Sequence, residues 1–275
     1  MKEQIKKVLH ATGLLPTVQA FYFNAKTSSP SVLRREMAYR RAGAPDGLPL
    51  PPPDLIYEVI ACRWAAVFLD SGKIVADDMV RILEKNGLSL DAFDHLLDFG
   101  CGCGRLLRHF APRSPGVHLY GSDYNPRLIE WDRANLDFAN FSVNALPPPL
   151  SYDTGHFDFV YARSVFTHLP EDLQQAWMQE LHRILKPGGV LYFTTHGRPL
   201  TLHLPEDLAA AFDADQLVVL REKLAGDNLC TTFQSFGYTK NTLLTDFDLL
   251  DFVEGRDTDH LRQDVYLVRK KSLGA

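Results

Sequence analysis

The chain has 275 residues and carries 29 Lys and Arg against 34 Asp and Glu, a formal net charge of −5. Hydrophobic residues make up 45% of the sequence and charged residues 23%, so the chain can bury a full core, which excludes global disorder and a disulfide-stapled miniprotein. The mild negative charge gives no reason to expect a nucleic-acid partner, because binding nucleic acid draws on Lys and Arg that neutralise phosphates.

The four cysteines, Cys62, Cys101, Cys103 and Cys230, indicate reduced thiols and a cytoplasmic location. Two of them stand one residue apart, too close for an ordinary structural disulfide, and no second pair completes a tetrahedral zinc site. The basic start of the chain lacks the apolar segment of about 7–15 residues that a signal peptide requires. No apolar run approaches the roughly 18 residues of a membrane span.

Residues 1–53 differ in composition from the rest. Up to Arg41 they hold eight basic residues against two acidic ones, and they end in a proline-rich stretch that no helix could cross. Such a basic arm can serve as a lid or as a clamp for an anionic substrate, or it can simply face solvent, as charge runs usually do. We predict a basic extension with a Pro-rich linker over 1–53 and one further domain over 54–275.

Apolar residues recur at helical spacing after Asp54, a candidate N-cap, and predict two helices, over about 55–68 and 75–83. Strands and helices then alternate, which predicts right-handed crossovers and a mostly parallel sheet covered on both faces. In chain order, we predict a strand at 95–99, a helix at about 105–110, a strand at 117–122, a helix at 125–136, strands at 141–143 and 157–162, a helix at 171–185 and a strand at 190–195.

The pattern changes after His196. Residues 201–230 predict an inserted helical segment whose apolar face includes Leu217, Val218, Leu220 and Leu224. Two strand-like runs, 247–253 and 264–268, follow it. They are joined through a short polar segment, so we expect an antiparallel pair and not another crossover.

The most informative stretch is 96–105, Leu-Leu-Asp-Phe-Gly-Cys-Gly-Cys-Gly-Arg. An apolar strand runs into glycines at 100, 102 and 104 and then into a helix, so the backbone can approach a ligand where a Cβ atom would obstruct it. A dinucleotide fingerprint, G-x-G-x-x-G/A, would place its third small residue at position 105, where this chain has Arg105. The spacing therefore weighs against NAD.

The pattern acid-x-Gly-x-Gly-x-Gly, which begins at Asp98, instead resembles the first motif of class I S-adenosylmethionine-dependent methyltransferases. The resemblance spans about residues 92–195. Asp123, at the end of the second strand, can accept two hydrogen bonds from a ribose diol, or it can merely cap the next helix. The loop from Asn144 to Pro147 is similar to the loop that contacts adenine in this family, although the family often has Asp at the position of Asn144.

Two further segments extend the resemblance. Residues 157–170 resemble the family's fourth strand and the turn that leaves it, and residues 181–189 resemble the helix end and glycine turn before its fifth strand. At the turn, Arg163 could also grip a carboxylate or phosphate of the substrate, or form a salt bridge. The resemblance implies cofactor contacts from Asp98, Gly100, Cys101, Gly102, Gly104, Asp123, Tyr124, Asn144, Ala145, Arg163 and Ser164.

Methyl transfer from a sulfonium is an in-line displacement, so the protein mainly has to position the reactants. An amine acceptor needs no base, whereas an alcohol needs its proton removed by a group within hydrogen-bond reach. His196 directly follows the strand at 190–195, at the edge where parallel sheets bind ligands, and is our preferred base, the alternative being a hydrogen-bonded loop residue. His168 is the second candidate, at a position where this family frequently has a histidine that helps to form a turn.

The resemblance implies an α/β three-layer sandwich with a seven-strand, mostly parallel sheet, an antiparallel edge strand and an N-terminal helical extension. We expect a methyltransferase that uses S-adenosylmethionine, yields S-adenosylhomocysteine, binds no metal and acts on a small-molecule or glycan-like acceptor, more at oxygen than at nitrogen. The fourth strand is not followed by an Asp-Pro-Pro-Tyr-like motif, which argues against DNA or RNA as substrate. A nicotinamide-dependent oxidoreductase and a non-catalytic cofactor-binding protein stay open as alternatives.

Overall fold

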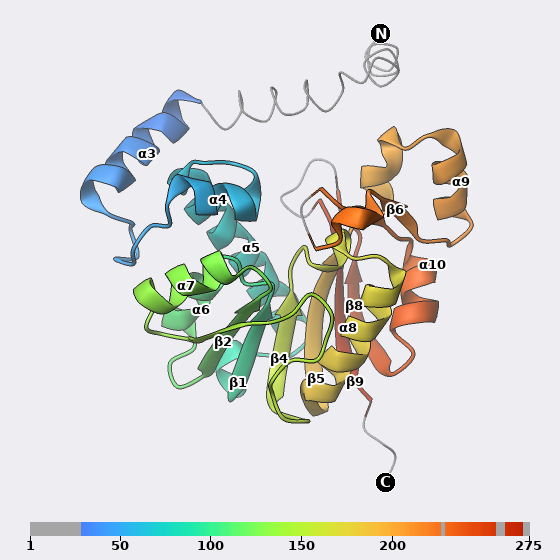
Figure 1. Cartoon of the computed structure of the whole chain (residues 1–275). Helices are drawn as coiled ribbons and strands as arrows, with labels where there is room; N and C mark the ends of the chain where they lie inside the picture. Colours follow the sequence, from blue (N-terminus) through green and yellow to red (C-terminus); the bar gives the residue numbers. More distant parts are fainter. Residues whose placement is uncertain (1–28, 227–228, 257–261, 272–275) are drawn as a thin grey trace. The chain divides into compact units, whose positions relative to one another are not determined.

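The computed structural model describes residues 29–226, 229–256 and 262–271 (Figure 1). The chain divides into two compact units, Met1–Asp70 and Ser71–Ala275. The boundary predicted after residue 53 marks a change in composition and stays a prediction. The first part of the basic arm, up to residue 28, lies outside the described residues.

The described part of the first unit is helical. It contains α3 (Pro30–Ala42), α4 (Pro53–Ile60) and the beginning of α5 (Ala65–Lys85). Glu36 is buried on α3, where one carboxylate oxygen accepts a hydrogen bond from Arg40 at 2.8 Å and the other accepts one from the backbone N–H of Ala66 at 2.9 Å. A buried carboxylate with charge-assisted partners of this kind ties α3 to the start of α5.

The two helices predicted before the first strand are divided differently in the structure. The first ends at Ile60, because Ala61 adopts a left-handed conformation with φ 52°. The second, α5, runs unbroken through Gly72, although the sequence pattern placed a gap there. A side chain at Gly72 would lie 2.7 Å from the backbone oxygen of Arg105, so the glycine permits close packing of α5 against the chain after β1.

Seven strands form one sheet in the order β3-β2-β1-β4-β5-β9-β8. The first five are parallel, whereas β9 is antiparallel to both β5 and β8. This arrangement confirms the mostly parallel sheet with an antiparallel edge. The strands are β1 (His95–Phe99), β2 (His118–Asp123), β3 (Asn140–Val143), β4 (Phe157–Ala162), β5 (Leu185–Thr195), β8 (Phe247–Val253) and β9 (Asp264–Lys270).

Helices cover both faces of this sheet. Helix α8 (Glu171–Ile184) lies on one face, where Trp177 packs on Phe99 of β1 with ring centroids 4.4 Å apart. The short α6 (Leu107–Phe110) lies on the opposite face, where the ring centroids of Phe110 and Tyr161 of β4 are 5.4 Å apart. Helix α7 (Pro126–Asn135) connects β2 to β3. Successive residues of a strand face opposite ways, which is why Phe99 and the neighbouring Asp98 belong to different layers.

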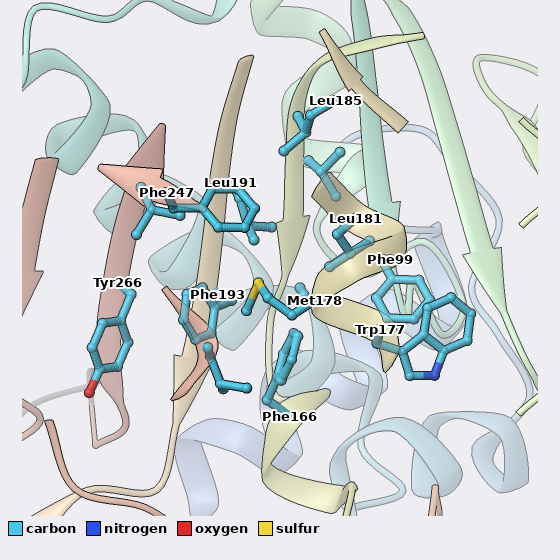
Figure 2. Close-up of a cluster of buried hydrophobic side chains, with 14 of the residues drawn as sticks. Phe99, Phe166, Trp177, Met178, Leu181, Leu185, Leu191, Phe193, Phe247 and Tyr266 are labelled. Carbon is cyan, nitrogen blue, oxygen red and sulfur yellow. The ribbon is translucent and has the colours of Figure 1, made fainter. Parts of the chain in front are cut away.

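A cluster of buried hydrophobic side chains fills the layer between α8 and the sheet (Figure 2). Its aromatic members come from distant parts of the chain, and Phe193 of β5 stacks on Tyr266 of β9 with centroids 4.9 Å apart. The ring centroid of Phe166, from the turn after β4, lies 5.1 Å from that of Phe193. The positions of β4 from Phe159 to Ala162 and of β5 from Gly189 to Thr195 are all buried, as expected of central strands covered on both faces.

The insertion is not wholly helical, so this prediction was wrong. It contains α9 (Glu206–Asp213), but Val218–Leu220 forms β6, which pairs with β7 (Thr231–Phe233) in a separate two-stranded sheet. Val218 packs against Phe212 and Phe233, and this contact with a distant partner outweighs the helix-like spacing of the apolar residues. None of the helices in the described part of the chain is long and apolar enough to cross a membrane.

Candidate cofactor and acceptor site

The carboxyl ends of the parallel strands bring the predicted site residues to one edge of the sheet. Asp98 lies near the end of β1, Asp123 ends β2, Asn144 follows β3, Arg163 follows β4 and His196 follows β5. In open α/β sheets, ligands bind in the crevice outside this edge.

The glycine loop after β1 has a conformation that favours glycine. Gly100, Gly102 and Gly104 have φ values of 80°, 58° and 62°, in the left-handed region that L side chains rarely adopt. A side chain at Gly100 would also lie 2.4 Å from Cγ2 of Val165. Both the backbone conformation and the space around the loop therefore require small residues here.

Asp123 connects this loop to the second strand. Its carboxylate accepts a hydrogen bond from the backbone N–H of Gly102 at 2.9 Å and another from the N–H of Asn125 at 2.9 Å. The residue that caps α7 is Asn125, whose side chain accepts from Arg127. A carboxylate has about four lone-pair positions, so the two backbone bonds orient Asp123 without exhausting its capacity to accept hydrogen bonds from a ribose.

Asp98 is a buried carboxyl, 2% exposed. Burial raises the pKa of Asp98 to about 8, and the nearby charge of Asp123 adds to this rise, while Tyr161 and Arg105 oppose it. Burial also lowers the pKa of Arg105, to about 10. Asp98 is therefore largely protonated near neutral pH, and a cationic ligand group next to it would favour its ionised form.

Cys101 and Cys103 form no disulfide and are buried within the loop. Burial raises the pKa of the Cys101 thiol well above its usual range, with the negative charge of Asp132 as the next cause. A thiol in this state is a poor nucleophile, because the thiolate is the reactive form. The Cys101 thiol is therefore not a candidate nucleophile.

The loop after β3 is held against the second strand. The backbone N–H of Asn144 donates to the backbone oxygen of Asp123 at 3.0 Å, and the hydroxyl of Ser122 donates to Asn144 Oδ1 at 3.0 Å. Asn144 Nδ2 donates to the backbone oxygen of Ala145 at 2.7 Å. Tyr124, which directly follows Asp123, is 43% exposed.

A second polar cluster lies at the ends of β4 and β5. Thr194 Oγ1 accepts hydrogen bonds from the backbone N–H of Ser164 at 2.8 Å and from Arg163 Nη1 at 3.3 Å. Thr194 donates to Gln263 Oε1 at 2.7 Å. Gln263 Nε2 donates to Ser164 Oγ at 2.8 Å and lies 3.3 Å from His196 Nε2. The structure thus brings Arg163, Ser164 and His196 together, through Gln263.

The two candidate histidines are neighbours at this edge. Their ring centroids lie 6.2 Å apart in an edge-to-face arrangement, and the ring centroid of Phe233, in β7, lies 5.4 Å from that of His196. His168 Nδ1 lies 2.6 Å from the backbone oxygen of Cys230. Burial lowers the pKa of His196 to about 3, and the positive charges of His168 and Arg163 lower it further, so His196 is neutral at physiological pH.

Sequence reasoning did not assign Gln263 to the site. It lies 69 residues from Thr194 in the chain, immediately before β9. Because β9 is antiparallel to β5, with Asp264 paired to Thr195, its amino end meets the carboxyl end of β5. A polar residue just before an antiparallel strand next to the site is the signal that could have identified it.

The described loops of the insertion reach the same region. The backbone N–H of Gly226 donates to the backbone oxygen of His168 at 2.8 Å. A side chain at Gly226 would lie 2.6 Å from Leu146 and 3.7 Å from Tyr124. The insertion therefore contacts both the loop after β3 and the turn that carries His168.

Comparison with known proteins finds similarity to two O-methyltransferases, among others. The chain is 27% identical over 113 residues to the ubiquinone biosynthesis O-methyltransferase of Coxiella burnetii, covering 40% of this chain and 47% of that protein. It is 33% identical over 103 residues to the malonyl-[acyl-carrier protein] O-methyltransferase of Enterobacter lignolyticus, covering 38% and 39%. The chain thus spans less than half the length of these two curated relatives.

A solved structure supports the fold. It is the 1,6-didemethyltoxoflavin-N1-methyltransferase of Burkholderia thailandensis, with bound 1,6-didemethyltoxoflavin and S-adenosylhomocysteine. The two structures superpose with a TM-score of 0.52 at 16% identity, over 82% of this chain and 92% of that one.

The family model described as "Methyltransferase domain" matches residues 72–243, more than half of the chain. This match decides against the nicotinamide-dependent oxidoreductase that the sequence left open. It covers the glycine loop, Asp123, the turn after β4 and the histidines, which are the parts that form the edge described above. The chain therefore belongs to the methyltransferase-domain family, and its seven-strand sheet has the fold of the S-adenosylhomocysteine-bound neighbour.

Proposed function

We propose that this enzyme methylates a hydroxyl oxygen of a small-molecule or glycan-like acceptor. The observation that carries the proposal is the pair of neighbouring histidines at the carboxyl edge of the sheet, with ring centroids 6.2 Å apart. An alcohol must lose its proton as it attacks, and a positioned histidine is the side chain most often used for that transfer. Methylation of a neutral amine would need no such group during attack.

The residues at the edge fit the cofactor. The left-handed glycine loop allows the backbone to approach a ligand, and the oriented carboxylate of Asp123 suits a ribose diol. When bound, S-adenosylmethionine supplies an electrophilic methyl group on a positively charged sulfur. The proposed cofactor contacts are the set expected from the sequence: Asp98, Gly100, Cys101, Gly102, Gly104, Asp123, Tyr124, Asn144, Ala145, Arg163 and Ser164.

We place the acceptor where the insertion meets the candidate histidines. Gly226 of the insertion contacts the turn that carries His168, and Phe233 of the adjoining strand β7 contacts His196 at the end of β5. Apolar and aromatic groups at this position favour an acceptor with an apolar or ring-shaped face. The names of the two O-methyltransferase relatives support methylation at oxygen, although their own acceptors are not transferred to this chain.

A cytoplasmic location belongs to the same proposal. It is supported by the four cysteines, Cys62, Cys101, Cys103 and Cys230, which are all buried and form no disulfide. Reduced thiols are typical of the cytosol.

The test is a transfer assay with methyl-labelled S-adenosylmethionine and a panel of alcohols and phenols, each matched by its amine analogue. We expect labelled product from hydroxyl acceptors, with the methyl group located on oxygen by NMR. The Gly102→Val variant serves as the control without cofactor binding. Labelling confined to the amine analogues would refute O-methylation.

A further inference from the structure

Arg163, at the end of β4, has no acidic partner within the described part of the chain. Its side chain makes one hydrogen bond there, a long one from Nη1 to Thr194 Oγ1 at 3.3 Å, and its buried Nε has no hydrogen-bond partner. By contrast, Arg40, Arg183 and Arg198 each donate to a carboxylate. The guanidinium of Arg163 therefore keeps donors that these residues leave unused.

The acids at this edge of the sheet do not neutralise Arg163. Asp98 is largely protonated near neutral pH, Asp123 accepts two backbone N–H groups, and Asp264 accepts one at 2.8 Å. Burial lowers the pKa of Arg163, and among the described residues only Tyr192 opposes this effect. Burial raises the pKa of Tyr192 to about 12, so its phenol is uncharged near pH 7. A partly buried cation without a counterion favours the binding of an anion.

Arg163 adjoins the half of the edge where we place the acceptor. Thr194 Oγ1 contacts both Arg163 and the side chain of Gln263, and Gln263 in turn lies 3.3 Å from His196. The two strongest charges acting on His196, from His168 and Arg163, are both positive. Positive charge of this kind attracts a ligand that carries a negative group.

The backbone next to Arg163 is firmly held. Ser164 has a left-handed conformation with φ 64°, which costs a residue other than glycine free energy. Its N–H donates to Thr194 Oγ1 at 2.8 Å, and its hydroxyl lies 2.8 Å from Gln263 Nε2. Strain of this kind persists where the surroundings impose it, and it is concentrated at ligand-binding sites. The turn therefore fixes the point from which the Arg163 side chain leaves β4.

We propose that Arg163 binds a carboxylate or phosphate group of the methyl acceptor, so that the acceptor is an anionic alcohol or phenol. The inference rests on the proposed O-methylation. A guanidinium can form two parallel hydrogen bonds to either group, so it orients the acceptor as well as attracting it. S-adenosylmethionine also has a carboxylate, and Arg163 is one of the proposed cofactor contacts, so the experiment has to separate the two anions.

Anion binding can be measured without a known acceptor. The full chain with ¹⁵N-labelled histidine is titrated with benzoate and with inorganic phosphate at constant ionic strength. The NMR signals of His196 are assigned by their loss in His196→Gln. We expect at least one of the two anions to shift these signals saturably, both in the free protein and with saturating S-adenosylhomocysteine. A shift that persists with S-adenosylhomocysteine separates the anion from the carboxylate of the cofactor.

Variants connect the shift to Arg163. Arg163→Gln should weaken anion binding roughly 10–150-fold, the range expected for hydrogen bonds to a charged group. Arg163→Lys keeps the charge and should weaken it less, which guards against a loss caused by misfolding. Arg198→Gln is the matched control, because Arg198 lies two residues after His196 but is already bonded to Asp213. This control should bind the anion as the wild type does.

Three results would each overturn the proposal. The first is the lack of a saturable shift with either anion, and the second is an unchanged anion affinity in Arg163→Gln. The third is loss of the shift when S-adenosylhomocysteine is bound, which would assign Arg163 to the carboxylate of the cofactor alone.

Transfer assays supply the second readout. Labelled S-adenosylmethionine is offered with 3-hydroxybenzoate against 3-hydroxybenzamide, and with glucose 6-phosphate against glucose. We expect the anionic member of a pair to have the higher kcat/KM, and Arg163→Gln to reduce this preference roughly tenfold or more, mainly through KM. A preference for the neutral members would refute the anionic acceptor. Methylation confined to amine analogues would instead refute O-methylation and leave the anion-induced shift of His196 unchanged, so the two failures are distinguishable.

Discussion

Asp123→Asn offers the sharpest test of the cofactor site. In the wild type, the two carboxylate oxygens each accept a backbone N–H, from Gly102 and from Asn125, both at 2.9 Å. An amide keeps only one acceptor oxygen, so its NH₂ group must face one of these donors or turn away from both. The variant loses the negative charge and at least one acceptor for the ribose hydroxyls.

The expected loss follows from the strength of such bonds. Hydrogen bonds to charged groups contribute about 1.5–3 kcal/mol. Since about 1.4 kcal/mol corresponds to a tenfold change, S-adenosylhomocysteine should bind roughly 10–150-fold more weakly to Asp123→Asn. Isothermal titration of the purified variant measures the change directly.

Asp158→Asn is the matched control. Asp158 also accepts two backbone N–H groups, from Asp94 at 3.0 Å and His95 at 2.9 Å, but it lies at the amino end of β4, the opposite edge of the sheet. This variant should lose stability and keep its affinity for S-adenosylhomocysteine. If Asp123→Asn bound within threefold of the wild type, or if both variants lost affinity equally, Asp123 would not be the ribose ligand.

Three further predictions concern the glycine loop and its buried acids. Gly102→Val should abolish S-adenosylhomocysteine binding in the same titration, because a β-branched residue is strained at φ 58° beside the ligand; wild-type affinity would contradict this. Burial raises the pKa of Asp98 to about 8, so binding of cationic S-adenosylmethionine should release a proton and tighten as the pH rises toward 8. Titrations in two buffers of different ionisation enthalpy measure this release, which Asp98→Asn should eliminate. Burial raises the pKa of Asp132 to about 9, so the folded protein keeps a proton that the unfolded chain loses above about pH 4. The free energy of unfolding should therefore fall as the pH rises from about 4 toward 9. Asp132→Asn should therefore gain free energy of unfolding relative to the wild type between pH 5 and pH 9 in urea melts, and parallel pH profiles would refute the raised pKa.

Local patterns predicted much of the fold. The strands at 95–99, 157–162 and 247–253 have the predicted bounds, because each is an apolar or alternating run bordered by residues that end it. The glycine loop could also be predicted from the sequence, since glycines at alternate positions indicate a left-handed backbone that few other residues adopt. These features depend on neighbours in the sequence and so are visible in it.

The helices before β1 and the insertion were less predictable. Residues 61–64 separate α4 from α5, and nothing in the side chain of the left-handed Ala61 marks it as a helix end. Val218–Leu220 became a strand because β7 pairs with it. Strand propensity depends on the partner strand, so a short apolar run does not determine its own conformation.

The sequence by itself determined the class of fold, the cofactor loop and both histidines as candidates. Only the tertiary structure decided which partners surround His196, because Gln263 reaches Thr194 and His196 across the antiparallel pairing of β9 with β5. The tautomer of a histidine depends on which donor or acceptor faces each ring nitrogen. Those partners come from residues far apart in the chain, so no local pattern contains them.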